Sequence, residues 1–280
     1  MTRRDFRGVA TLKGGMVMSF VIYFIVGILA GVIGGLLGTG GCALMMPVIR
    51  FGFHFDPAFA VGTTLTAVVF TAGSGAVQHI RMGNVDKQTA WVTGASGILG
   101  VIIGSVVFAY VMPYGELIDL IIGCAFLLVT LRMLYEGGKG LFGKNPMPQP
   151  AAGGGMPGSS LQKGVLGSAI GFLTGIVGLG GGYALVPSFI YLFKAPMKLA
   201  IGTSMASFVW MALVGAIFKF YQNVVNLPVA ITLGVGALIG AIYGAKLVAK
   251  FKPAVLKFLF GLLFLYVSLK YIFIYFGIAI

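Results

Sequence analysis

The sequence predicts an all-α, multi-pass membrane protein built from two homologous repeats, and three observations predict this fold class. The 280-residue chain is 59% apolar and only 9% charged, which is not typical of a soluble domain. Apolar runs such as 16–37 are long enough to cross the ~30 Å hydrocarbon core of a bilayer. Glycines and prolines of the first half recur at a constant offset of 140 residues, with Gly178 in the place of Gly38, which indicates an internal duplication.

Each half contains five apolar elements around one glycine-rich break, GTGG at 38–41 and GLGG at 178–181. We expect a basic N-terminal tail at 1–15, a first repeat at 16–136, a Gly/Pro-rich linker at 137–162 and a second repeat at 163–280. The expected elements are 16–37, 42–53, 57–80, 88–111 and 114–135, then 163–177, 182–193, 197–220, 228–249 and 254–277.

The second element of each half is too short to span a membrane alone. It has about 12 residues and rises only about 18 Å. The break before it frees backbone groups, and such groups persist at membrane depth only when they are buried in protein or line a wet cavity. We therefore expect elements one and two to form a broken helix or a re-entrant pair, as in many secondary transporters.

Two topologies remain open. If the first two elements make no net crossing, the halves are inverted and the basic tail 1–15 lies outside. If they cross once, the halves are parallel and the basic cluster 246–257 lies outside. Each scheme conflicts with the positive-inside rule at one cluster. The segment 110–116 has no basic residue whereas its equivalent 250–257 is basic, which favours inverted repeats.

Charge and cysteine content exclude several functions. The net charge of +13 is explained by basic loops that set topology, and we expect no nucleic-acid partner. Cys42 and Cys124 lie in apolar segments, so we expect no disulfide, metal or cofactor, and no motif indicates an enzyme. The second half has no carboxylate, and a buried cation site normally needs one. An anionic or neutral substrate fits better, because all acidic residues lie in the first half: Asp5, Asp56, Asp86, Glu116, Asp119 and Glu136.

The breaks are the predicted substrate site. Free N–H groups and the N-termini of the elements at 42–53 and 182–193 suit an oxyanion. The alternative is tight helix packing through small residues, which we expect for Gly27, Gly31 and Gly35. Nearby hydroxyls either donate to the anion or bond back to the preceding turn. The predicted substrate-binding residues are Gly38, Thr39, Gly40, Gly41, Cys42, Thr63, Thr64, Gly178, Gly180, Gly181, Gly182, Thr203 and Ser204.

A second group of polar residues ends the third element of each half. His79 could carry a coupling proton, because the unperturbed pKa of a histidine lies near physiological pH. Arg81 could pair bidentately with an oxyanion. The alternatives are an interfacial histidine and a cytoplasmic-loop arginine. The neutral donors Gln78, Gln222 and Asn223 complete this predicted coupling or gate group. Lys219 stands where the first half has His79, so we expect no symmetric role for that position.

The ordered motifs resemble the TauE/SafE family, also called the 4-toluenesulfonate uptake permease family. The resemblance rests on GVIGGLLGTGGCALMMPV at 31–48, AVGTTL at 60–65 and H-x-x-x-G-x-V-D at 79–86. It continues in GFLTGIVGLGGGYALVPS at 171–188 and AIGTSM at 200–205. It implies a multi-pass permease for small sulfur-containing anions such as sulfite, sulfoacetate or another organosulfonate.

We therefore expect a secondary transporter that moves such an anion across the cytoplasmic (inner) membrane, with export as the expected direction. Its partners would be the small sulfur anion and the lipid bilayer, with proton coupling and a homodimer as further expectations. A small-anion channel is the alternative, because both need the same anion-binding breaks. A membrane scaffold is a more distant alternative, since long polar interaction segments are missing apart from the linker.

Overall fold

The computed structural model describes residues 13–142, 155–178 and 181–276, so Leu179 and Gly180 of the second break lie outside the description. Within these ranges the secondary structure is helical, without strands, as predicted. The elements are α1 (Lys13–Leu37), α2 (Cys42–Pro47), the π-helical turn Val48–Gly52, α3 (Pro57–Arg81), α4 (Lys87–Val111), α5 (Gly115–Phe142), α6 (Ser160–Val177), α7 (Gly182–Tyr191), α8 (Met197–Tyr221), α9 (Leu227–Leu247), the 3₁₀ turn Val248–Lys250 and α10 (Pro253–Tyr275).

Local sequence explains where these helices begin. Asp86 before α4 and Asn226 before α9 each accept a hydrogen bond from the N–H three residues on, at 3.2 and 3.4 Å. Ser159 and Gln162 form a capping box at the start of α6. Pro57 opens α3, where a missing N–H is tolerated. These caps satisfy donors that lipid cannot satisfy.

Among the described residues, seven helices are long and apolar enough to cross a membrane. The segment Cys42–Gly52 is shorter, as the sequence predicted, and it contains Pro47 at the point where α2 passes into the π-helical turn. These findings support a multi-pass membrane protein with two interrupted helices.

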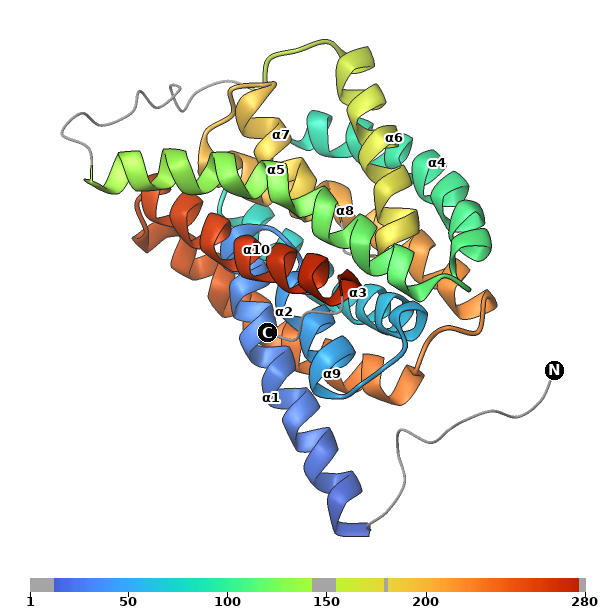
Figure 1. The fold of residues 1–280 in the computed structure, drawn as a ribbon. Helices are drawn as coiled ribbons and strands as arrows, with labels where there is room; N and C mark the ends of the chain where they lie inside the picture. The colour runs from blue at the N-terminus through green and yellow to red at the C-terminus, as the bar shows by residue number, and fades with distance from the viewer. Residues whose placement is uncertain (1–12, 143–154, 179–180, 277–280) are drawn as a thin grey trace.

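The helices associate mainly in pairs from opposite halves of the chain. α1 packs on α9, α4 on α6, and α5 on α10, while α3 and α8 contact each other at the centre. In Figure 1 the green α5 and the red α10 lie side by side. The contacts of two glycines show the relative directions of α3 and α8. Gly75 of α3 faces Met205, whereas Gly215 of α8 faces Leu65, so α3 and α8 run antiparallel.

Glycines bring several helix pairs into backbone contact. A Cβ on Gly27, Gly31 or Gly35 would collide with carbonyl groups of α9, and a Cβ on Gly167, Gly171 or Gly175 would collide with α4. A Cβ added to Gly35 would lie 2.9 Å from Ala245 N, and a Cβ added to Gly175 would lie 2.7 Å from Ser105 N. The packing role predicted for Gly27, Gly31 and Gly35 is therefore confirmed.

The helices extend into the predicted linker 137–162 at both of its ends. α5 continues to Phe142 and α6 begins at Ser160, while 143–154 lie outside the described residues. Before α6 the chain packs on the protein core. Met156 N–H donates to Asp86 Oδ2 at 2.6 Å, and Lys163 Nζ donates to Met156 O at 2.7 Å. Composition alone did not indicate this contact.

Candidate functional site

The first break, residues 38–41, turns the chain sharply between α1 and α2. Gly38, Gly40 and Gly41 have φ of 76°, 71° and 79°, a region that side chains with a Cβ rarely adopt. The surrounding space is also closed, because a Cβ on Gly41 would lie 2.5 Å from Ala30 O. Both expected properties of these glycines, unusual backbone angles and close packing, are present.

The residue that follows the second break, Gly182, meets the first break. Gly178 ends α6 with φ 66°, and Gly182 begins α7. A Cβ on Gly182 would lie 2.7 Å from Thr39 Cα and closer still to Gly38 O. Gly181 lies against Ile170 and Met211 instead. The starts of α2 and α7 therefore come together inside the protein, and the breaks do not lie on opposite membrane faces.

Buried hydrogen-bond donors without acceptors gather at the first break. Gly40 and Gly41 are buried, and within the described chain their N–H groups have no acceptor. The hydroxyls of Thr39 and Thr64 are also buried and have no hydrogen-bond partner in the described residues. Burying a polar group without a hydrogen-bond partner costs about 1–3 kcal/mol of free energy. A ligand or a water molecule that accepts from these donors would remove this cost.

Sequence reasoning missed a third such hydroxyl, that of Thr71. A Cβ on Gly40 would meet Val68 Cγ1 at 2.6 Å, and Thr64 and Thr71 lie one helical turn to either side of Val68 on α3. Residues at this spacing share a helix face. Helical periodicity counted from Thr64 could have identified Thr71.

The other predicted hydroxyls are already engaged. Thr63 Oγ1 accepts from Asn226 N–H at 3.0 Å, and Thr203 Oγ1 accepts from Asp86 N–H at 2.9 Å. Ser204 Oγ donates to Gly38 O at 3.0 Å and to Ile201 O at 2.8 Å. Thr63 and Thr203 thus position the loops that precede α9 and α4, and Ser204 holds the first break against α8.

His79 is fully buried rather than interfacial. Its Nε2 lies 3.0 Å from Gly35 O and must be the donor, because a carbonyl oxygen only accepts. Lys219, its equivalent in α8, is also fully buried and donates from Nζ to Gly175 O at 2.7 Å. Both side chains cap carbonyls at the end of an interrupted helix. The expectation that this position has no symmetric role is wrong for helix capping, because His79 and Lys219 each donate to a carbonyl near the end of an interrupted helix.

The remaining predicted gate residues are half-buried or exposed. Gln222 is half-buried, and its Nε2 donates to Ser105 O at 2.6 Å. Arg81 and Asn223 are exposed, and the Asn223 side chain donates to Tyr221 O at 3.4 Å. Gln78 is half-buried. Because α3 and α8 run antiparallel, the Gln78–Arg81 group and the Gln222–Asn223 group lie at opposite ends of this helix pair.

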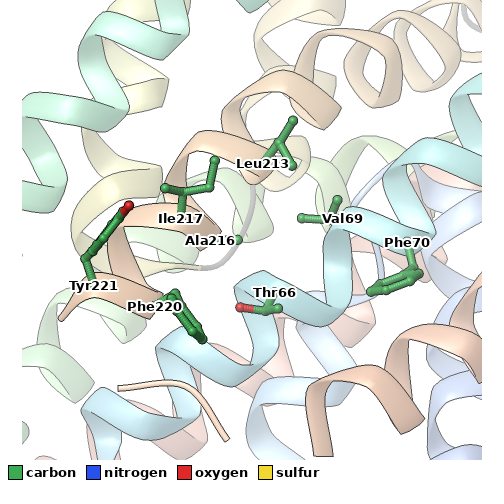
Figure 2. Close-up of a pocket in the computed structure, with 8 residues that line it drawn as sticks. All are labelled: Thr66, Val69, Phe70, Leu213, Ala216, Ile217, Phe220 and Tyr221. Atoms are coloured by element: carbon green, nitrogen blue, oxygen red, sulfur yellow. The ribbon is translucent and has the colours of Figure 1, made fainter. Parts of the chain in front are cut away.

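A groove on the surface between α3 and α8 does not contain the predicted site. Figure 2 shows that its lining is almost entirely apolar. Of its two hydroxyl groups, that of Thr66 already donates to Gly62 O at 2.8 Å and that of Tyr221 belongs to an exposed side chain, so the groove offers an oxyanion few buried donors. The lining residues are Thr66, Val69, Phe70, Leu213, Ala216, Ile217, Phe220 and Tyr221.

Carboxylates of the described residues serve structural contacts away from the breaks. Asp119 pairs with Arg50 at 3.0 Å, and Asp86 holds the start of α4. Burial would raise the pKa of the Asp86 carboxyl, but hydrogen bonds from Met156 and Thr89 and the charge of Lys163 hold that pKa below its ordinary value. Within the described residues, no hydrogen bond or ion pair joins a carboxylate to either break.

Two interrupted helices that meet inside a multi-pass helical bundle define a class of membrane protein typical of transporters. The family model described as "Sulfite exporter TauE/SafE" matches residues 23–271. The chain belongs to this family.

Similar proteins cover most of the chain. "Probable membrane transporter protein YunE" of Bacillus subtilis (strain 168) is 28% identical over 251 residues, which are 82% of this chain and 89% of that protein. "Probable membrane transporter protein YdhB" of the same organism is 25% identical over 79% of this chain and 87% of its own length. "Probable membrane transporter protein MJ0441" of Methanocaldococcus jannaschii is 25% identical, with 79% and 83% covered. No solved structure matches the chain. The family and these relatives indicate a membrane transporter.

Proposed function

We propose that the protein is a secondary transporter that carries a small sulfur-containing anion, such as sulfite or sulfoacetate, out of the cell across the cytoplasmic membrane. The observation that carries this proposal is a cluster of buried donors at the first break that have no acceptor among the described residues: the N–H groups of Gly40 and Gly41 and the hydroxyls of Thr39, Thr64 and Thr71. The family description names sulfite export, which supports the choice of anion.

The electrostatics of the break suit an oxyanion. The segment Cys42–Gly52 and helix α7 both direct their N-termini towards the meeting point of the two breaks. Helix N-termini attract negative charge, and free N–H groups point at such a ligand. An anion bound there would accept hydrogen bonds from these donors, so binding would remove the free-energy cost of burying them without acceptors.

The arrangement of equivalent helices supports inverted repeats, which we include in the proposal. α3 and α8 are equivalent under the 140-residue offset and run antiparallel. The contacts of α1 with α9 recur as contacts of α6 with α4. In a protein with inverted repeats, one broken pair can open to one side while the other closes, which gives alternating access to a shared site.

The proposal is tested by flux measurements in proteoliposomes with radiolabelled sulfite and sulfoacetate. Saturable, concentrative transport is expected. Replacing Thr64 or Thr71 with valine removes a hydroxyl that has no hydrogen-bond partner among the described residues, so these variants should fold normally and show a raised KM. Thr66→Val is the matched control, because its hydroxyl bonds to Gly62 O and faces the surface groove. Equal KM values in all three variants would contradict the site assignment, and absence of sulfur-anion flux would contradict the function.

A small-anion channel would use the same donors. It differs in kinetics, because a channel shows neither saturation at low substrate nor stimulation by a counter-substrate inside the vesicle. Flux that does not saturate and is not stimulated by a counter-substrate would therefore indicate a channel and not a carrier.

A further inference from the structure

Lys219 is a buried lysine that has no carboxylate partner among the described residues. Its side chain has no exposed area, its Nζ donates to Gly175 O at 2.7 Å, and the ammonium lies 3.1 Å from the centroid of the Phe108 ring. Within the described residues Lys219 forms no ion pair. An ammonium has three N–H donors, and one carbonyl together with one aromatic face leaves part of that capacity unused.

Two unpartnered polar atoms belong to the same junction of α4, α6 and α8. Ser105 Oγ and Gln222 Oε1 are both buried without a hydrogen-bond partner in the described residues. They are tied to Lys219 through neighbouring atoms. Gln222 Nε2 donates to Ser105 O at 2.6 Å, and the Cβ position of Gly175 lies 2.7 Å from Ser105 N. The junction therefore presents an amino group together with a hydroxyl and an amide oxygen that have no partner among the described residues.

The equivalent junction in the other half is built differently. The residues 140 positions away from Lys219, Gln222 and Ser105 are His79, Met82 and Ala245. His79 still caps the end of α1 at Gly35 O, so capping alone does not require a lysine. Two polar groups that capping does not need, Ser105 and Gln222, accompany the lysine on one side only.

We propose that Lys219, Ser105 and Gln222 form a binding subsite for a singly charged oxyanion that carries a hydrogen-bond donor of its own. The ammonium supplies one positive charge, which matches one negative charge. Ser105 Oγ donates to an anion oxygen, and Gln222 Oε1 accepts from the donor of the anion. Hydroxysulfonates and protonated sulfite have this chemistry.

The position of the subsite fits a step on the transport path and rests on the proposed function. Gly175 lies one helical turn before Gly178 of the second break, whereas Tyr221 at the end of α8 is 78% exposed. The subsite thus lies between the protein surface at the end of α8 and the second break.

The experiment measures binding to purified protein in detergent by isothermal titration calorimetry, with 2-hydroxyethanesulfonate, ethanesulfonate and sulfate as probes. We expect 2-hydroxyethanesulfonate to bind with the highest affinity of the three, because ethanesulfonate lacks the hydrogen-bond donor and sulfate carries a second negative charge. Lys219→Met should weaken binding of 2-hydroxyethanesulfonate about 10- to 100-fold, the range for hydrogen bonds to charged groups. Gln222→Met should remove the preference over ethanesulfonate.

Each variant can be matched to a residue that the chain itself uses. Gln222→Met and Ser105→Ala install the residues of the equivalent junction, Met82 and Ala245. His79→Met is the control, because it removes the corresponding cap of α1 without touching the subsite. A loss of binding in His79→Met as large as that in Lys219→Met would overturn the proposal, since it would assign the effect to helix capping.

Thermal unfolding of each variant shows that it is folded. Unchanged binding of all three probes in folded Lys219→Met would also overturn the subsite, even when Thr64→Val impairs sulfite flux and so upholds the proposed function. Conversely, Lys219-dependent binding without any sulfur-anion flux would uphold the subsite and contradict the proposed function.

Discussion

Replacing Gly182 with alanine should separate the two breaks. Gly182 begins α7, and its φ is not in the left-handed region, so the substitution adds a Cβ without backbone strain. That Cβ would lie 2.7 Å from Thr39 Cα and closer to Gly38 O. Backbone atoms cannot rotate away as a flexible side chain can, so α7 must move relative to the first break.

The magnitude follows from two opposing effects. Overpacking of a well-packed interior typically costs about 1–3 kcal/mol, while alanine in place of glycine in a helix gains about 0.5–1 kcal/mol. The difference between these two effects spans about 0–2.5 kcal/mol, and we expect Gly182→Ala to lower the free energy of unfolding by about 1 kcal/mol, near the middle of that range. The matched control is Gly73→Ala in α3, whose nearest atom would be Val209 Cγ2 at 3.9 Å, an ordinary contact.

The assay is thermal unfolding of both purified variants in detergent, followed by sulfite flux in proteoliposomes. Gly182→Ala should have a lower Tm and a reduced flux, and Gly73→Ala should match or exceed the wild-type Tm. A Gly182→Ala protein as stable and as active as wild type would refute the inference that contact between the breaks supports transport.

Three further predictions concern single side chains. The pKa of the Asp86 carboxyl is held below its ordinary value in the folded protein. The stability that the carboxylate contributes is therefore present above the unfolded-state pKa and is lost as the pH falls through the folded-state pKa. Between pH 6 and pH 3, the Tm of the wild type should fall more steeply than the Tm of Asp86→Asn. Thr63→Val leaves Asn226 N–H without its acceptor and should lower the free energy of unfolding by about 1–3 kcal/mol, whereas Thr64→Val should not lower the Tm; equal losses would contradict this assignment. His79→Gln can still donate to Gly35 O and should keep the wild-type Tm, and pH-dependent flux that this variant retains in full would rule out His79 as the carrier of a coupling proton.

Hydropathy and the placement of glycine and proline predicted the helices well. The expected element 197–220 is observed as Met197–Tyr221, because an apolar run bounded by a proline and polar residues leaves little choice in lipid. The short elements after the breaks were also predicted, since a run of this length cannot span a bilayer. These features depend on neighbouring residues in the chain.

Long-range contacts could not be predicted in the same way. The sequence shows a histidine at 79 and a lysine at 219, but their acceptors are the carbonyls of Gly35 and Gly175, more than forty positions away. Nothing local distinguishes Thr63, which holds the loop before α9, from Thr64, whose hydroxyl has no partner. The packing of α3 against its neighbours decides which hydroxyl remains free.

The central claim is that a small sulfur anion binds where the two breaks meet. The most direct test is to locate a bound anion by anomalous diffraction from crystals soaked with 2-bromoethanesulfonate, after competition with sulfite flux has shown that it uses the same path. We expect a sulfonate within hydrogen-bond distance of the N–H groups of Gly40 and Gly41, with its bromine signal beside them. A competing anion found only in the apolar groove between α3 and α8 would show that the anion does not bind at the breaks.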